Sequence, residues 1–233
     1  YQIVSLSVDS IHTLQIRKFG NPRGIPVILV HGGPGAPSKD YQAGYFDKRY
    51  YNIILFDQRG CGTSRPLGEL TNNNTQELIE DIEKVRLHCG FKKIILYGGS
   101  WGASLIILYL MRYPEKVIFF IIRSICLLKE KVFTQSYKQM YPEQWEKFIS
   151  MGDPTNLSKT ISKYFEKIKQ HDKKYIQSWS NWELPCLNII PEESKINMRG
   201  KELYYYCLLE SYYFKNDFFL PPNFILNNLS KIK

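Results

Sequence analysis

The pentapeptide GGSWG at 98–102 places a hydroxyl nucleophile, Ser100, between small residues. It follows an apolar run at 94–97, which predicts a short buried strand, and precedes an apolar run at 103–111, which predicts a buried helix. A serine in such a strand-to-helix turn is held in a strained conformation with its hydroxyl exposed. The pattern therefore predicts a catalytic nucleophile, with the backbone amide of Trp101 directed at the oxyanion of a tetrahedral intermediate.

Two further loops rich in glycine follow apolar strands in the same way. The run at 27–30 leads into HGGPG at 31–35, and the run at 53–56 leads into DQRGCGTS at 57–64. Loops that leave the carboxyl ends of parallel strands come to one edge of the sheet, where open α/β sheets hold their sites. The pentapeptide alone also fits a helix N-cap serine, but three such loops together favour an active site.

Three motifs, in this order, resemble the signatures of the proline iminopeptidases, which are serine peptidases of the α/β-hydrolase fold. They are HGGPG at 31–35, DQRGCGTSRP at 57–66 and GGSWGASLIILYLMRYPEKV at 98–117. The likeness covers nearly the whole chain. It implies an aminopeptidase that releases N-terminal proline from peptides through an acyl-enzyme on Ser100. By position, it also makes the backbone amide of Gly33 the second oxyanion donor.

Substrate recognition is expected in a helical cap, because an aminopeptidase must bind a free α-ammonium group and buried carboxylates do so. The resemblance matches Glu183 and Glu210 to the two glutamates with this role. It matches Arg123 to an arginine that organises them and Phe214 to an aromatic wall of the proline pocket. Without the resemblance, the glutamates would be interpreted as exposed helical residues and Arg123 as a surface ion-pair partner. His31 is expected to support its loop.

Two departures from the family concern the preference for proline. The chain has RSIC at 123–126 where the family usually has Arg-Gly-Ile-Phe, so one aromatic residue of the proline pocket is lost. The stretch at 129–141 is also shorter than in the family, which leaves the pocket tyrosine unassigned. The strictness of the proline preference is therefore open.

The expected catalytic acid and base are absent from this sequence. In this fold the triad runs Ser, Asp, His, and the last two residues follow the cap. The histidines are His12, His31, His88 and His171. All of them precede the return from cap to core, and the last aspartate, Asp217, lies in the expected cap. We therefore expect the C-terminal part of the core to be missing, this chain alone to be inactive, and the strand at 117–122 to have an unpaired edge.

Two other function classes stay open. One is a cap-bearing esterase or amidase of the same fold, which release of free proline would distinguish from hydrolysis of simple acyl esters. The other is a non-catalytic binding protein that kept the cap and lost the triad. A coding frame that continues past codon 233 to a late Asp and a Gly-His would support a truncated enzyme.

The resemblance and the periodicity together predict an α/β architecture with two parts. Residues 1–124 are expected to form an α/β-hydrolase core, with a mostly parallel sheet and an N-terminal antiparallel hairpin, and residues 125–233 a helical cap. In the core we expect the hairpin at 3–19, strands at 27–30, 52–57, 93–97 and 117–122, and a helix at 75–89 capped by Asn74. In the cap we expect helices at 128–139, 142–150, 157–169, 171–182 and 198–214.

The composition of the 233 residues favours a soluble cytoplasmic enzyme. The net charge of +9 is spread evenly along the chain, which argues against a nucleic-acid partner. No apolar run approaches the 18 residues or so of a membrane span. Five cysteines without a C-x-x-C pair predict reduced thiols. We expect no metal or cofactor, and a small peptide with a free N-terminus as the partner.

Overall fold

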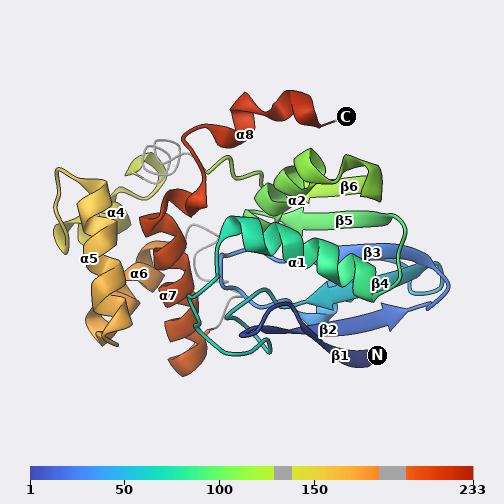
Figure 1. Cartoon of the computed structure of the whole chain (residues 1–233). Helices are drawn as coiled ribbons and strands as arrows, with labels where there is room; N and C mark the ends of the chain where they lie inside the picture. The colour runs from blue at the N-terminus through green and yellow to red at the C-terminus, as the bar shows by residue number, and fades with distance from the viewer. Residues whose placement is uncertain (129–137, 184–197, 233) are drawn as a thin grey trace. The chain divides into compact units, whose positions relative to one another are not determined.

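The computed structural model describes residues 1–128, 138–183 and 198–232 (Figure 1). The chain divides into two compact units. Unit 1 comprises Tyr1–Leu127 and Phe219–Lys233, and unit 2 comprises Leu128–Phe218. Each unit is described by itself.

A mixed sheet of six described strands organises unit 1, in the order β1-β2-β4-β3-β5-β6. The strands are β1 (Gln2–Ser7), β2 (Thr13–Gly20), β3 (Ile25–Val30), β4 (Tyr51–Phe56), β5 (Ile94–Gly99) and β6 (Val117–Arg123). The first two form the expected antiparallel hairpin, and β2 also pairs antiparallel with β4. The β4-β3-β5-β6 part is parallel. The predicted hairpin and parallel strands are therefore confirmed.

The centre of the sheet consists of apolar residues that are buried on both faces. Residues 27–30 of β3 and 53–56 of β4 are all buried, as is usual for parallel strands between layers of side chains and helices. The order of the sheet sets the carboxyl ends of β3, β4 and β5 at one edge, since these strands are parallel. The three loops rich in glycine therefore leave the sheet together, as the sequence predicted.

Strand β6 has the opposite character. It lies at the end of the sheet and, among the described residues, pairs only with β5. Ile118 and Phe119 are 54% and 58% exposed, and Phe120 and Ile121 are exposed as well. The prediction that this apolar strand would have an unpaired edge is therefore confirmed for the described part of the chain.

Two long helices accompany the sheet in unit 1, α1 (Thr75–His88) and α2 (Trp101–Arg112). They contact each other, and α2 also contacts β3, β5 and β6. The Asn74 side chain caps α1 by accepting from the Glu77 amide at 3.0 Å, as predicted. Most of α2 is buried, which fits its run of apolar residues.

Shorter elements complete unit 1. They are η1 (Asp40–Tyr45), η2 (Pro114–Lys116), α8 (Phe224–Asn227) and η6 (Leu229–Lys231), and η5 (Asp217–Phe219) joins it to unit 2. No helix in the described ranges is long and apolar enough to cross a membrane.

Unit 2 is helical, with α4 (Pro142–Ser150), α5 (Leu157–Lys169), α6 (Lys173–Glu183) and α7 (Gly200–Lys215). These match four of the five helices expected there, and most of the fifth, at 128–139, lies outside the described residues. An aromatic cluster forms its core. The Phe148 ring stacks on Tyr164 at 4.6 Å and on Trp182 at 4.3 Å between centroids, and Trp179 packs edge-on against Phe148. Such pairs add stability beyond the apolar area that they bury.

The compact units differ from the predicted division into 1–124 and 125–233. The first boundary falls at 127/128, and residues 219–233 group with unit 1 rather than with the helical part. Two contacts explain this grouping. The Gln76 side chain of α1 donates to the Phe219 carbonyl at 2.8 Å, and η6 packs against α2.

Candidate active site

Ser100 lies in a sharp turn between β5 and α2. Its backbone has φ 55° and ψ −125°, a region that residues with side chains rarely adopt. The neighbouring glycines allow this turn because backbones pass close on both sides. A Cβ on Gly98 would lie 2.9 Å from the Val30 carbonyl oxygen, and one on Gly102 would overlap the same atom. The predicted strained turn is confirmed.

The 31–35 loop lies directly against this turn. A Cβ on Gly32 would lie 3.6 Å from the Cβ of Ser100 and 3.3 Å from the Gly99 carbonyl oxygen. Gly33 has φ 121°, and a side chain there would meet the Gly35 amide at 2.5 Å. The structure therefore brings together the expected nucleophile and the two peptide segments that carry Gly33 and Trp101.

His31 supports its loop, as expected, and is not free to act as a base. The ring is buried, Nδ1 lies 2.9 Å from the Gly32 carbonyl oxygen, and Nε2 accepts from the Gln58 amide at 2.9 Å. These contacts fit a neutral ring with its proton on Nδ1. Burial lowers the pKa of His31, which favours the same neutral form.

Gln58 links the two peptide segments that carry Gly33 and Trp101, a contact that the sequence reasoning missed. Its side-chain nitrogen donates to the His31 carbonyl oxygen at 2.8 Å. Its side-chain oxygen accepts from the indole nitrogen of Trp101 at 3.1 Å. The residue is 3% exposed. The only signal in the sequence was its place in the DQRG motif.

Asp57 holds the loops around the site. It accepts from the amide and hydroxyl of Ser38 at 2.9 and 2.5 Å, and from the amide and hydroxyl of Thr63 at 2.8 and 2.7 Å. Arg17 approaches it at 3.2 Å. Burial opposes its ionisation, but the hydrogen bonds from Ser38 and Thr63 lower the pKa of Asp57 overall.

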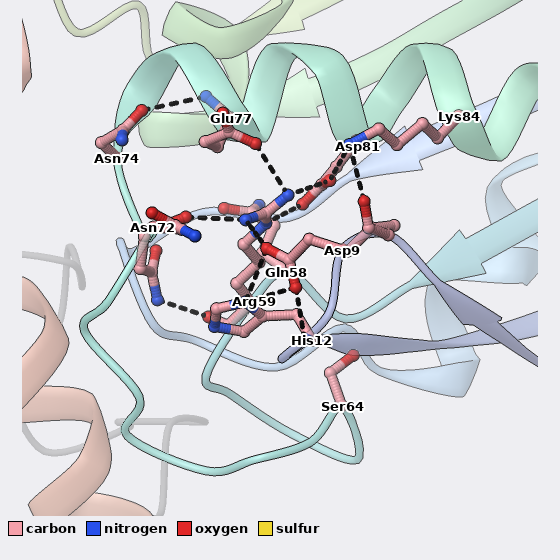
Figure 2. Close-up of polar contacts among 12 residues, drawn as sticks. Asp9, His12, Gln58, Arg59, Ser64, Asn72, Asn74, Glu77, Asp81 and Lys84 are labelled. Atoms are coloured by element: carbon pink, nitrogen blue, oxygen red, sulfur yellow. Dashed lines mark hydrogen bonds and ion pairs between the residues drawn. The ribbon is translucent and has the colours of Figure 1, made fainter.

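Arg59 anchors the same loop to α1 and to the β1–β2 turn (Figure 2). The buried guanidinium pairs with both oxygens of Asp81, at 2.6 and 2.8 Å. It also donates to Asp9 at 2.7 Å, to Glu77 at 3.0 Å and to the Asn72 carbonyl oxygen at 2.7 Å. Its donors are thus committed to protein groups, and we assign Arg59 a structural role.

Arg123 ends β6 beside Ser100. Its carbonyl oxygen accepts from the Ser100 amide at 3.1 Å. Its side chain runs along Gly99, where an added Cβ would lie 3.0 Å from the Arg123 Cγ. The structure thus places Arg123 with Ser100, whereas its expected role towards the glutamates involves unit 2.

Glu210 lies in the aromatic core of unit 2. It is 2% exposed and accepts from the Trp179 indole at 2.7 Å and from the Tyr206 hydroxyl at 3.1 Å. It is therefore not an ordinary exposed helical glutamate. The ring of Phe214 packs edge-on against Trp179 at 5.7 Å. Glu183 is the last residue of α6, and its side chain lies outside what the structure describes.

Among the described residues of unit 1, no histidine hydrogen-bonds the hydroxyl of Ser100. His12 pairs with Asp9, His31 is engaged as above, and His88 is exposed at the C-terminal end of α1. The same part of the chain contains no group of three or more acidic, histidine or cysteine side chains placed to hold a metal ion.

The strained turn and the sheet order define an α/β hydrolase, and residues 25–206 match the family model described as alpha/beta hydrolase fold. A proline iminopeptidase from Neisseria meningitidis serogroup B is 35% identical over 238 residues, which cover 98% of this chain and 76% of the relative. One from Arabidopsis thaliana is 32% identical, over 100% of this chain and 64% of the relative. The chain belongs to the proline iminopeptidase family of α/β-hydrolase-fold enzymes and is a hydrolase.

Solved structures support the fold. The crystal structure of a proline iminopeptidase from Mycobacterium smegmatis superposes with a TM-score of 0.58 at 15% identity, over 100% of this chain and 79% of that one. A structure from a study of carboxylesterases of Nitrososphaera gargenis gives a TM-score of 0.56 at 16% identity, over 97% of this chain and 75% of that one. At these low sequence identities, the two structures support the fold assignment alone.

Proposed function

We propose that this protein is a serine aminopeptidase that releases N-terminal proline from small peptides. The observation that carries the proposal is the strained Ser100 turn with the Gly33 loop packed against it. Membership of the proline iminopeptidase family supports the choice of substrate.

In the proposed reaction, the Ser100 oxygen attacks the carbonyl carbon of the N-terminal residue as a base takes the hydroxyl proton. The oxyanion that forms accepts hydrogen bonds from the amides of Gly33 and Trp101. Collapse of this intermediate breaks the peptide C–N bond, and the departing amine receives the proton. Water then attacks the acyl-enzyme, releases the free amino acid and restores the Ser100 hydroxyl.

Recognition of the substrate falls to acidic and aromatic side chains. We propose that Glu183 and Glu210 bind the substrate ammonium group and that Phe214 forms a wall of the proline pocket. The burial of Glu210 among Trp179 and Tyr206 supports this role, because a buried carboxylate attracts a cation strongly. We propose that Arg123 organises these carboxylates.

We further propose that the general base and its acidic partner lie outside these 233 residues. Two observations support this proposal. Ser100 has no histidine on its hydroxyl among the described residues of unit 1, and β6 exposes an apolar edge that a further strand would cover.

The experiment is a comparison of substrates with the product of the complete gene. Free proline released from proline amides and Pro-X peptides is measured beside hydrolysis of simple acyl esters, for the natural protein and for Ser100→Ala. Proline release that disappears in Ser100→Ala supports the proposal. Ester hydrolysis without proline release would instead indicate an esterase, and binding of peptides without turnover would indicate a binding protein.

A further inference from the structure

We propose that Gln58 is a positioning residue that sets the distance between the two oxyanion donors. The inference rests on the proposed roles of Ser100, Gly33 and Trp101. Gln58 contacts neither substrate nor Ser100 in this proposal. It acts through the peptide segments on either side of it.

The two ends of the Gln58 amide hold the two segments. The nitrogen donates to the carbonyl oxygen of His31, two residues before Gly33. The oxygen accepts from the indole of Trp101, whose own backbone amide is the other donor. The backbone amide of Gln58 also donates to Nε2 of the His31 ring, so Gln58 holds both the ring and the carbonyl group of His31.

Gln58 is itself fixed from both sides along the chain. The preceding residue, Asp57, accepts hydrogen bonds from Ser38 and Thr63. The side chain of the following residue, Arg59, is held by hydrogen bonds to Asp81, Asp9, Glu77 and the Asn72 carbonyl oxygen (Figure 2). The Gln58 side chain therefore extends from a rigid segment, which a positioning role requires.

The 31–35 loop needs such a restraint. Gly32 and Gly33 have no side chains through which the loop could be held, and Gly33 has φ 121°. Oxyanion donors act only at about 2.7–3.1 Å from the developing charge. A displacement of about 1 Å at either segment is therefore enough to lower the rate severely.

The chemistry of a glutamine suits this link. His31 offers a carbonyl acceptor and Trp101 an indole donor, so the linking group needs one donor and one acceptor at its end. Glutamate has nearly the same shape but places an acceptor against the His31 carbonyl. Methionine has a side chain of similar length and volume but makes neither of these two hydrogen bonds.

The test compares Gln58→Glu and Gln58→Met with Ser64→Ala in the complete gene product. Ser64 is a matched control, because it is buried in the same loop. Its hydroxyl donates to the backbone carbonyl oxygen of Asp57 and accepts from the Gln15 amide, and it contacts neither His31 nor Trp101. Kinetics with a proline amide are measured beside thermal unfolding and the NMR signals of the Gly33 and Trp101 amides.

We expect kcat to fall about 10- to 100-fold in both Gln58 variants, with KM within about threefold of the natural protein, since the donors act in the transition state. Ser64→Ala should keep kcat while losing similar stability. The Gly33 and Trp101 amide signals should shift in the Gln58 variants only. Unchanged amide signals, or a kcat change no larger than in Ser64→Ala, would overturn the inference.

Failure of the proposed function has a different signature. In that case the natural protein releases no proline, or Ser100→Ala releases as much as the natural protein does. The amide signals then still decide whether Gln58 positions the two segments.

Discussion

Replacing Asp57 by asparagine tests how the loops around Ser100 are held. The carboxylate is 1% exposed, with Ser38 and Arg17 on one oxygen and Thr63 on the other. Asparagine keeps one acceptor oxygen and turns an NH₂ group towards either the Ser38 amide or the Thr63 amide. One buried N–H donor then faces another and neither makes a hydrogen bond, which lowers the free energy of unfolding by about 1–3 kcal/mol.

The lost charge adds to this cost. Arg17 is largely buried, and removing one partner of a buried ion pair costs about 3–5 kcal/mol when no water replaces it. Arg17 also pairs with Asp40 at 2.7 Å and retains some exposure, which reduces this second cost to about 1 kcal/mol. We therefore expect a total loss of about 2–4 kcal/mol in the free energy of unfolding.

Urea unfolding measures this loss as a lower midpoint with an unchanged slope. Asp47→Asn is the matched control, since its pair with Arg49 lies on the surface, and it should leave the midpoint unchanged. A loss below about 1 kcal/mol for Asp57→Asn would refute the view that this carboxylate holds the loops.

Three further predictions concern pH, recognition and the sheet edge. Burial lowers the pKa of His31, so the folded state binds fewer protons than the unfolded state, and unfolding titrations should show stability falling as pH drops below about 6.5. Stability should fall again below about 3.9, where the unfolded chain protonates its aspartates while the lowered pKa of Asp57 keeps that carboxylate ionised in the folded state. Stability that stays constant from pH 7 to pH 5 would contradict the first step. In the complete gene product, Glu183→Gln or Glu210→Gln should lower kcat/KM for proline amides, with a loss of about 2–4 kcal/mol in transition-state binding energy. Unchanged kinetics for both variants would show that the substrate ammonium group is bound elsewhere. The 233-residue chain should aggregate and show no serine-dependent turnover, and Phe119→Lys on β6 should raise its soluble yield. A soluble parent chain with a cooperative melt would refute the edge argument.

The elements around the site could be predicted because their signals are local. Apolar runs of four residues predicted β3, β4 and β5, and the glycine spacing predicted the Ser100 turn. The exposed edge of β6 was expected from its apolar sequence and from the resemblance, which implies that strands following the cap pair with it.

The contacts that hold the site together could not be predicted in the same way. Gln58 meets His31 and Trp101 across separations of 27 and 43 residues, and Arg59 meets Asp9 across 50. No short-range pattern encodes such pairs. The burial of Glu210 was also hidden, because its helix carries tyrosines on several faces and gives no clear apolar stripe.

The grouping of residues 219–233 with unit 1 depends on similar distant contacts. The carbonyl of Phe219 meets Gln76 across 143 residues, and η6 meets α2. Composition alone could not assign this short stretch to either unit.

The central claim, that Ser100 forms an acyl-enzyme, is tested most directly by trapping that intermediate. The complete gene product is mixed with an activated proline ester, and the reaction is quenched in acid. The protein is then digested, and the masses of its peptides are measured by mass spectrometry. We predict one added prolyl group on the peptide that contains Ser100, and none in Ser100→Ala, which should also lose proline release. A prolyl group on another residue, or proline release that persists in Ser100→Ala, would contradict the account.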